Sequence, residues 1–543
     1  MDSELPSDGS KPAPLSERCQ TIVDLVVRSG TQAPRSAGIE IDGQFLSYAQ
    51  ILAQSRVVAA HFQRVGIRPG DRICSMIGSR AEVLLTWFGT LFAGAIWVPI
   101  NNGLTGDDLA YMIKDSGSSA MVVDREFLGK ICDPRVRPQL PTRKFLVDRQ
   151  GEAEFTPFSE LLTPGRTLDE VAVGPADPAV IIYTGGTTGL PKGVELPHFA
   201  MVAGAMRYQE AFKAEARDRH FSVSPLFHAG GLTIAILGPM MAGMHSTVDR
   251  KFSLSGYWDR VRSSGATIIN PIGVILTLLC KAAPSPSDTD HRVRVSIGVS
   301  SQLPDDISQQ FSKRFGVKLV NVYSLSEASG AMIVYNPVDS LVPSANGRPS
   351  PWVEIGIVDK ADQPLPRGEI GEIVLRPKVP HTFMLRYHNN DAETVKVFRN
   401  LWLHTGDLGY LDDKDYLFFK GREAHWLRRR GENISAQEVE SILSQFPHIA
   451  ELAVVGTPSE IGEEEVKVFI VPEHGQLIDP QALIRWCADR MAGFKVPRFV
   501  EFVDALPRST AKSEIERHKL RAMPNDKAWD RERAFGRQIP KSA

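Results

Sequence analysis

The residues best suited to chemistry lie in one stretch where an apolar strand runs into glycines, threonines and a lysine. It reads Ile181-Ile-Tyr-Thr-Gly-Gly-Thr-Thr-Gly-Leu-Pro-Lys-Gly-Val194. Glycines let backbone N–H groups crowd around an anion, threonine hydroxyls add donors, and Lys192 adds positive charge. It is not a Walker A loop, because Pro191 precedes the lysine and Gly193 follows it. The pattern predicts a phosphate-binding loop made of Thr184, Gly185, Gly186, Thr187, Thr188 and Gly189, with Lys192.

This stretch is similar, nearly residue for residue, to the phosphate loop of the adenylate-forming (AMP-binding) superfamily. Further motifs that resemble those of its acyl-CoA synthetases follow in the family's order. They read Pro225-Leu-Phe-His-Ala-Gly230, Asn321-Val-Tyr-Ser-Leu-Ser-Glu327, Trp402-Leu-His-Thr-Gly-Asp407, Gly421-Arg422, Arg428-Arg-Arg-Gly431 and Phe494-Lys-Val-Pro497. The resemblance implies an enzyme that joins a carboxylic acid to AMP, using ATP and Mg²⁺, and then passes the acyl group to coenzyme A.

The same resemblance assigns roles in the nucleotide site. The ring of Tyr323 would stack on adenine. Asp407 and Arg422 would bind the ribose, where one carboxylate can accept from two neighbouring hydroxyls. Glu327 would hold Mg²⁺, because a carboxylate oxygen suits a metal that bridges phosphates. Further nucleotide contacts are expected from Ser300, Asn321, Ser324 and Ser326.

Two more residues are assigned to acyl transfer. His228 would gate the acyl and pantetheine channels, and Gly431 would let the tunnel wall approach closely. With Lys192 and Glu327 they form the expected catalytic set. A lone histidine beside apolar residues is also typical of a packed core, so that alternative for His228 stays open. The arginines at 428–430 would help attract anionic CoA, unless they are simply solvated.

The chain departs from the family near its C-terminus, where a lysine normally contacts the acyl carboxylate and the α-phosphate during adenylation. Anchoring on Ile515 and the following Arg517-His-Lys-Leu520 places Glu514 at that position. A carboxylate there would repel both the acid and ATP. Losing one preorganised charge typically slows a reaction about a hundred- to a thousandfold. The alternative is that Lys512 substitutes after a local shift of the loop.

Smaller departures from the family pattern also favour a weakened adenylation step. Gly185 stands where the loop usually has serine, and Ala424 occupies the hinge position, usually Asp or Lys. We therefore predict a ligase that mainly forms acyl-CoA from an acyl-adenylate supplied by a separate adenylating enzyme. The alternatives are a complete ATP-dependent acyl-CoA synthetase, a protein that only binds an acyl-adenylate, and an enzyme that loads a carrier protein.

The apolar pattern indicates the elements that must position these motifs. Short apolar strands alternate with amphipathic helices, which is typical of parallel sheets covered by helices; the strands include 71–77, 119–124, 267–270 and 317–322. The expected fold is α/β. It has an N-terminal domain at 1–423, with a β-rich part at about 347–423, and a small mobile α+β lid at 424–543. The end after Met523 reads as a charged tail.

Composition limits the class of protein. A net charge of −2 gives no electrostatic reason to expect nucleic acid or an anionic membrane as partner. The five cysteines include no C-x-x-C pair, so we predict no zinc site and a cytoplasmic protein. The uncharged stretch 83–100 is long enough for a membrane span, but its glycines and Pro99 favour a buried helix and strand. The Gly- and Met-rich segment 238–244 suggests a roomy apolar pocket for a bulky hydrophobic acid.

Overall fold

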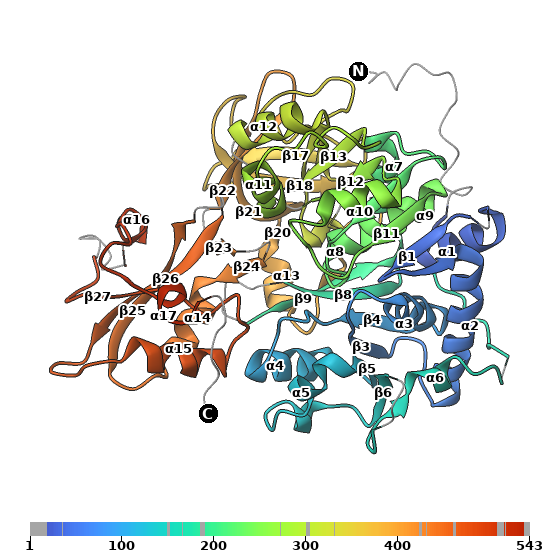
Figure 1. Ribbon diagram of the computed structural model, residues 1–543, viewed down its shortest axis with the longest axis horizontal. Helices are drawn as coiled ribbons and strands as arrows, with labels where there is room; N and C mark the ends of the chain where they lie inside the picture. Colours follow the sequence, from blue (N-terminus) through green and yellow to red (C-terminus); the bar gives the residue numbers. More distant parts are fainter. Residues whose placement is uncertain are drawn as a thin grey trace.

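Five sheets organise the part of the chain that the structure describes. The structure is a computed structural model, and the described residues are 19–34, 36–148, 152–165, 167–184, 190–271, 273–299, 305–330, 332–422, 426–429, 432–459, 463–507, 515 and 517–536. Figure 1 shows the C-terminal region, coloured orange to red, standing beside the larger N-terminal body.

The first large sheet has nine strands, and two motifs follow the carboxyl ends of its strands. Neighbours from β14 to β1 run parallel, so Tyr323 and the segment 225–230 emerge at one edge. The sheet order is β16 (Arg348–Pro349), β15 (Val334–Tyr335), β14 (Lys318–Tyr323), β13 (Val295–Val299), β12 (Ile268–Ile269), β10 (Arg219–Ser222), β11 (His245–Val248), β1 (Gly38–Ile41) and β2 (Gln44–Ser47).

The second large sheet has eight strands and carries the predicted phosphate loop. β8 ends at Thr184 and pairs antiparallel with β9, which begins at Lys192, so the two strands close the base of the loop. The order is β19 (Arg386–Tyr387), β9 (Lys192–Pro197), β8 (Pro178–Thr184), β4 (Ile96–Pro99), β3 (Arg72–Met76), β5 (Ala120–Asp124), β6 (Arg143–Val147) and β7 (Thr156–Pro157).

Helices cover these sheets, as the alternation of strands and helices predicts (Figure 1). α1 and α2 begin with capping boxes at Thr21 and Ser47, whose side chains accept N–H groups of the first turn. The helices are α1 (Ile22–Gln32), α2 (Tyr48–Arg64), α3 (Ala81–Phe92), α4 (Gly106–Ser116), α5 (Leu128–Ile131), α6 (Phe158–Leu161), α7 (His198–Phe212), α8 (Ala229–Gly231), α9 (Gly238–Ala242), α10 (Tyr257–Ser264), α11 (Gly273–Lys281) and α12 (Asp305–Phe315). A π-helical turn, Leu232–Leu237, joins α8 to α9.

The uncharged stretch 83–100 forms the buried helix α3 and the strand β4, as predicted. Trp87 and Trp97 stack with ring centres 5.1 Å apart, and the Trp97 indole donates to the Ser75 hydroxyl at 2.9 Å. This stretch is therefore part of the core. Among the described residues, no helix is both long and apolar enough to cross a membrane.

The predicted β-rich part forms a separate five-stranded sheet with one short helix. The elements are β17 (Val353–Val358), β18 (Gly371–Pro377), α13 (Asp391–Val397), β20 (Phe398–Arg399), β21 (Trp402–Leu411) and β22 (Leu417–Arg422).

The C-terminal domain has its own apolar core and combines helices with strands, as expected of an α+β lid. Its elements are β23 (Trp426–Arg429), β24 (Glu432–Ser435), α14 (Ala436–Leu443), β25 (Ile449–Pro458), β26 (Glu464–Pro472), α15 (Pro480–Ala488), β27 (Phe499–Phe502), α16 (Arg517–Arg521), β28 (Trp529–Asp530) and α17 (Arg531–Phe535). The prediction of a charged tail after Met523 is wrong for 524–536. Trp529 pairs with Val500, and the buried Arg531 donates to the backbone oxygen of Val496 at 3.0 Å.

Candidate active site

A buried tyrosine–aspartate pair lies where three of the motifs meet. The hydroxyl of Tyr323, at the end of β14, donates to Oδ2 of Asp407 in β21 at 2.8 Å. Both side chains are buried. The backbone of Asp407 also pairs with that of Arg422 in β22. The fold thus brings together the three residues expected at adenine and ribose, although they lie far apart in the sequence.

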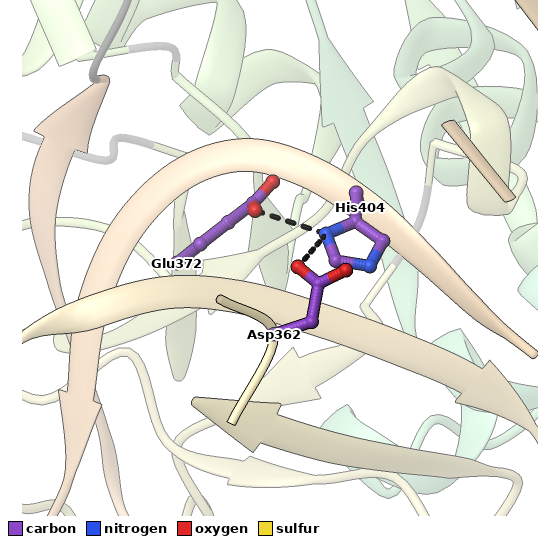
Figure 2. Close-up of side chains that lie close together, drawn as sticks. All are labelled: Asp362, Glu372 and His404. Atoms are coloured by element: carbon purple, nitrogen blue, oxygen red, sulfur yellow. Dashed lines mark hydrogen bonds and ion pairs between the residues drawn. The ribbon is translucent and has the colours of Figure 1, made fainter. Parts of the chain in front are cut away.

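A charged cluster holds the beginning of the strand that carries Asp407. Figure 2 shows the carboxylates of Asp362 and Glu372 directed at Nδ1 of His404, at 3.9 and 2.9 Å. Nη2 of Arg399 lies 2.9 Å from the same nitrogen and 3.0 Å from Oδ1 of Asp362. Because a guanidinium already supplies positive charge here, we interpret the cluster as a structural ion-pair network and not as a metal site.

This network reaches Asp407 through the backbone. Glu372 accepts the N–H of Gly406 at 3.0 Å, and the Thr405 hydroxyl donates to the backbone oxygen of Ile373 at 2.6 Å. The same hydroxyl accepts the N–H of Asp407 at 3.1 Å. Gly406 has a φ of +69°, a left-handed conformation that favours glycine. The turn before Asp407 is therefore held on both sides, which sets the direction of its carboxylate.

Glu327 and the phosphate-loop lysine face one tyrosine. Glu327 belongs to the 3-10 turn Ser326–Ala328, and its Oε1 accepts from the Tyr387 hydroxyl at 2.8 Å. The ammonium of Lys192 lies 5.0 Å from the centre of the Tyr387 ring and pairs with Glu393. A carboxylate and an ammonium from two separate motifs are thus brought to one place, as a site for a metal-bound phosphate requires.

The C-terminal domain contacts the His228 segment directly. Nε2 of His228 lies 3.2 Å from Oε1 of Glu432 in β24, and the Asn101 amide donates to the same oxygen at 3.3 Å. Burial alone would lower the pKa of His228, but the Glu432 carboxylate outweighs it and holds that pKa above its usual value. Burial would raise the pKa of Glu432, yet His228 holds it below its usual value. The two side chains form a charged pair between the domains.

A second, buried contact joins the same two domains. Lys495 pairs with Asp108 of α4 at 2.9 Å and with Glu438 of α14, and all three side chains are at most 8% exposed. Burial lowers the pKa of Lys495, but the two carboxylates outweigh it and the pKa stays above its usual value. Burial, opposed by Lys495 and assisted by Asp108, raises the pKa of Glu438 to about 7.

Several predicted site residues lie outside the described part of the chain. They are Gly185, Gly186, Thr187, Thr188, Gly189, Ser300, Ala424, Gly431, Lys512 and Glu514, together with the side chain of Arg422. Of the others, Thr184 ends β8 opposite Lys192, and Asn321 donates to the backbone oxygen of Ala345 at 3.4 Å. Ser324 and Ser326 lie between Tyr323 and Glu327.

The prediction that Arg429 helps to attract CoA is wrong. Arg429 is 1% exposed, and its Nε lies 2.6 Å from a carboxylate oxygen of Glu465. Its Nη1 donates to the backbone oxygens of Phe494 and Val496 at 2.9 and 3.2 Å. This arginine therefore holds the C-terminal domain together. Alternation along β23 directs it inward, a signal that a run of three arginines conceals.

Sequence reasoning missed four residues of the site, namely Asp108, Tyr387, Glu393 and Glu432. Only Glu432 had a usable signal, because it directly follows Gly431 in a motif. Asp108 and Glu393 lie in the first turns of α4 and α13. Carboxylates are common there because they favour the positive end of the helix dipole, so nothing distinguishes these two in the sequence.

Comparison with known proteins agrees with this arrangement. The family model described as AMP-binding enzyme matches residues 27–387, and that described as AMP-binding enzyme C-terminal domain matches residues 438–512. The crotonobetaine/carnitine–CoA ligase of Salmonella agona (strain SL483) is 32% identical over 484 residues. The match covers 87% of this chain and 92% of that protein.

Two solved structures of o-succinylbenzoate CoA synthetase from Bacillus subtilis share the fold at 24% identity. A double mutant bound with the product analogue OSB-NCoA has a TM-score of 0.81 and covers 93% of this chain and 98% of that chain. The enzyme in complex with AMP has a TM-score of 0.66 and covers 92% and 98%.

The two helix-covered sheets and the smaller C-terminal domain form the fold shared with these solved structures, and the two family models give the class: an adenylate-forming enzyme. The chain belongs to the AMP-binding enzyme family, among its acyl-CoA ligases, and is an acid–thiol ligase.

The buried contact makes docking of the C-terminal domain depend on pH. Because Asp108 helps to raise the pKa of Glu438 to about 7, the docked state binds that proton more tightly than the undocked state. The contribution of Glu438 to docking is therefore larger below about pH 7 and weakens as pH rises through about 7, by up to about tenfold per pH unit. Loss of the His228 charge above its raised pKa acts in the same direction. Hydrogen exchange of α4 amides at about pH 6 and about pH 8 measures this change.

Two variants identify the groups responsible. Glu438→Gln resembles the protonated form and should reduce the change in α4 protection between the two pH values. Asp108→Asn should lower protection at both. The amides of α2 serve as reference for the chemical pH dependence of exchange. Equal α4 protection in the wild type and Glu438→Gln at the higher pH would contradict the assignment.

Proposed function

We propose that the protein forms an acyl-CoA thioester from an acyl-adenylate and CoA, and that its own ATP-dependent adenylation step is weak or absent. The observation that carries the proposal is the contact of Glu432 with His228. It holds strand β24, whose first residue Glu432 follows Gly431 in the sequence, against the segment expected to gate the acyl and pantetheine channels. The adenylate would come from a separate adenylating enzyme.

The relative arrangement of the domains supports the thioester-forming step. The same synthetase superposes better on this chain with a CoA product analogue bound (TM-score 0.81) than in complex with AMP (0.66). Identity and coverage are nearly equal in the two comparisons. The difference therefore reflects how the parts are arranged, and the arrangement here is closer to that of the product-analogue complex.

In this step the thiolate sulfur of CoA attacks the carbonyl carbon of the acyl-adenylate. A C–S bond forms, the bond from that carbon to the phosphate oxygen breaks, and AMP leaves with the electron pair. The thiol proton is released. The adenylate is already reactive, so this step needs no lysine at the α-phosphate, and Glu514 does not oppose it.

The position of Glu514 supports the loss of adenylation. Ile515 packs against the apolar cluster that contains Leu506 and Leu520, so the residue used to align the motif is anchored on the C-terminal sheet. Glu514 directly precedes this anchor, whereas Lys512 is two residues further away. The second candidate is a complete ATP-dependent acyl-CoA synthetase that uses Lys512. The related crotonobetaine/carnitine–CoA ligase favours it, because that protein is named a CoA ligase.

Groups that the fold gathers would hold the nucleotide and the metal. Tyr323, Asp407 and Arg422 would bind the adenosine, and the loop 184–189 with Lys192 would bind the phosphates. Glu327 fits Mg²⁺, because this ion is commonly bound by one or two carboxylates plus substrate phosphates. Only Oε1 of Glu327 is engaged by a described residue. The metal would offset phosphate charge.

The acid is expected to be bulky and hydrophobic. The segment after His228 begins with the small residues Ala229, Gly230 and Gly231 and continues into the π-helical turn Leu232–Leu237 and the Met-rich α9. Gly231 is closely packed, since a Cβ there would lie 2.1 Å from the backbone oxygen of Pro225, but methionine side chains adapt to irregular apolar shapes. The apolar character of this segment therefore favours an apolar acyl group over a short polar one.

Loss of the Asp407 carboxylate should weaken AMP binding. A hydrogen bond to a charged group contributes about 1.5–3 kcal/mol, so Asp407→Asn is expected to raise the Kd for AMP about ten- to a hundredfold. Tyr323→Phe keeps the ring and removes only the hydroxyl that orients the carboxylate, so its effect should be smaller. Calorimetry with AMP measures both. Asp413→Asn, at an exposed aspartate beyond β21, is the control and should bind normally.

The two half-reactions should separate in a direct assay. Purified protein given acid, ATP and Mg²⁺ is expected to release pyrophosphate slowly, because Glu514 repels the reacting groups. Given acyl-adenylate and CoA without ATP, it should form acyl-CoA rapidly. Glu514→Lys should raise pyrophosphate release about a hundred- to a thousandfold if it restores the missing charge.

Matched variants decide between the two candidates. Glu516→Lys makes the same charge change two residues away and should not restore adenylation. Lys512→Ala should leave both half-reactions almost unchanged. Rapid pyrophosphate release by the wild type, abolished in Lys512→Ala, would establish the complete synthetase instead. Saturable adenylate binding without CoA consumption would reduce the protein to an adenylate-binding protein.

A further inference from the structure

Arg207 of α7 carries a buried charge that the proposed mechanism does not use. Its side chain is 0% exposed. Nη2 donates to the Ser329 hydroxyl at 2.5 Å and to the backbone oxygen of Ala328 at 3.4 Å. Nε and Nη1 are buried and have no hydrogen-bond partner among the described residues. Within the described residues, two of the three guanidinium nitrogens are therefore left without an acceptor.

Among the residues that the structure describes, the other two fully buried arginines, Arg429 and Arg531, each lie near a carboxylate, and Arg207 does not. Nε of Arg429 lies 2.6 Å from Glu465, and Nη2 of Arg531 lies 3.6 Å from Glu532. Within the described part of the chain, no carboxylate lies within ion-pair distance of Arg207. Glu210, three residues along the same helix, accepts from the Tyr335 hydroxyl at 3.0 Å instead.

Arg207 nevertheless stays charged. Burial lowers the pKa of its guanidinium to about 10, with Glu210 and Tyr335 opposing the shift, so it remains a cation at neutral pH. A buried cation is costly unless an acceptor compensates it. The turn 326–329 uses only Nη2, so holding this turn does not account for the other two nitrogens.

Arg207 reaches the place where the His228 and Glu327 segments pack together. Its partner Ser329 has a backbone oxygen that accepts from the Thr233 hydroxyl at 3.3 Å. The next residue, Gly330, packs so closely that a Cβ there would lie 2.3 Å from the Cβ of Ala229. Thr233 belongs to the π-helical turn Leu232–Leu237, an irregularity that often marks functional sites.

We propose that Arg207 is a specificity-determining residue that recognises a second hydrogen-bond acceptor, a carboxylate or keto oxygen, on the acyl part of the substrate. The inference rests on the proposed function, because it assumes that an acyl-adenylate lies beside the place where the His228 and Glu327 segments meet. The free guanidinium nitrogens would bind the acceptor, which would complete their hydrogen bonds. The substrate class is then a largely hydrophobic acid with a carbonyl or carboxylate beyond the activated carboxyl group.

Binding of stable adenylate analogues tests this directly. N-acylsulfamoyl adenosines are prepared in matched sets at several chain lengths, with an acyl chain that is unsubstituted, ω-oxo or ω-carboxylic. Calorimetry with the wild type is expected to show about ten- to a hundredfold tighter binding of an acceptor-bearing analogue at one chain length. Arg207→Met should abolish this preference, and Arg207→Lys, which keeps a donor and the charge, should retain part of it.

The outcomes separate this inference from the proposed function. If the wild type binds all three analogues equally at every length, Arg207 recognises no acceptor, while the adenylate site stands. If no analogue binds, the proposed function itself fails. An unchanged preference in Arg207→Met would also overturn the inference, as would equal weakening of all three analogues, which indicates a role in the turn alone. The wild-type measurement decides even if Arg207→Met does not fold.

Discussion

The site depends on the ion pairs of Lys495. Its ammonium is buried between carboxylates of two domains. Removing one partner of a buried ion pair typically costs about 3–5 kcal/mol, because the remaining charge is uncompensated. As long as Asp108 faces Lys495, the C-terminal domain keeps Glu432 at His228. The hairpin β23–β24 then lies against the segment that follows β10. This contact therefore determines which parts of the two domains meet.

The N-terminal half of the site is built differently. Tyr323 and Asp407 meet through strand ends, a turn at Gly406 and the ion pairs around His404, all of which lie within the N-terminal part of the chain. Their geometry does not require the C-terminal domain. The nucleotide residues are thus positioned by the fold, whereas the residues expected at the acyl and pantetheine channels are completed by docking. The nucleotide residues can therefore keep their positions while the residues at the acyl and pantetheine channels rearrange with the C-terminal domain.

Much of the fold and of the candidate site was predictable from local sequence patterns, and the predictions that failed did so for one reason. Apolar strands, the buried stretch 83–100 and the adenylate-forming family were correctly predicted because each depends on neighbouring residues. The inward direction of Arg429, the pairing of Trp529 with Val500 and the partners of Lys495 depend on residues that are distant in sequence. From the sequence alone, polar side chains that pair over such distances would be expected to face solvent. Glu514 itself stays a prediction, since it lies outside the described residues.

The buried Lys495–Asp108 pair and the carboxylate at position 514 are related, because both bear on whether the C-terminal domain must move. An enzyme that performs both half-reactions by turning its C-terminal domain must separate Asp108 from Lys495 in every cycle, and breaking their mutual attraction together with the other docking contacts adds to its barrier. An enzyme that starts from a preformed adenylate needs no such rearrangement, so a strong contact costs it nothing. A replacement of the adenylation lysine by Glu514, as proposed, would therefore remove the selection against a tightly docked domain. A lysine restored at 514 would act only in molecules whose C-terminal domain has undocked, so adenylation by Glu514→Lys should increase further when Asp108→Asn is added.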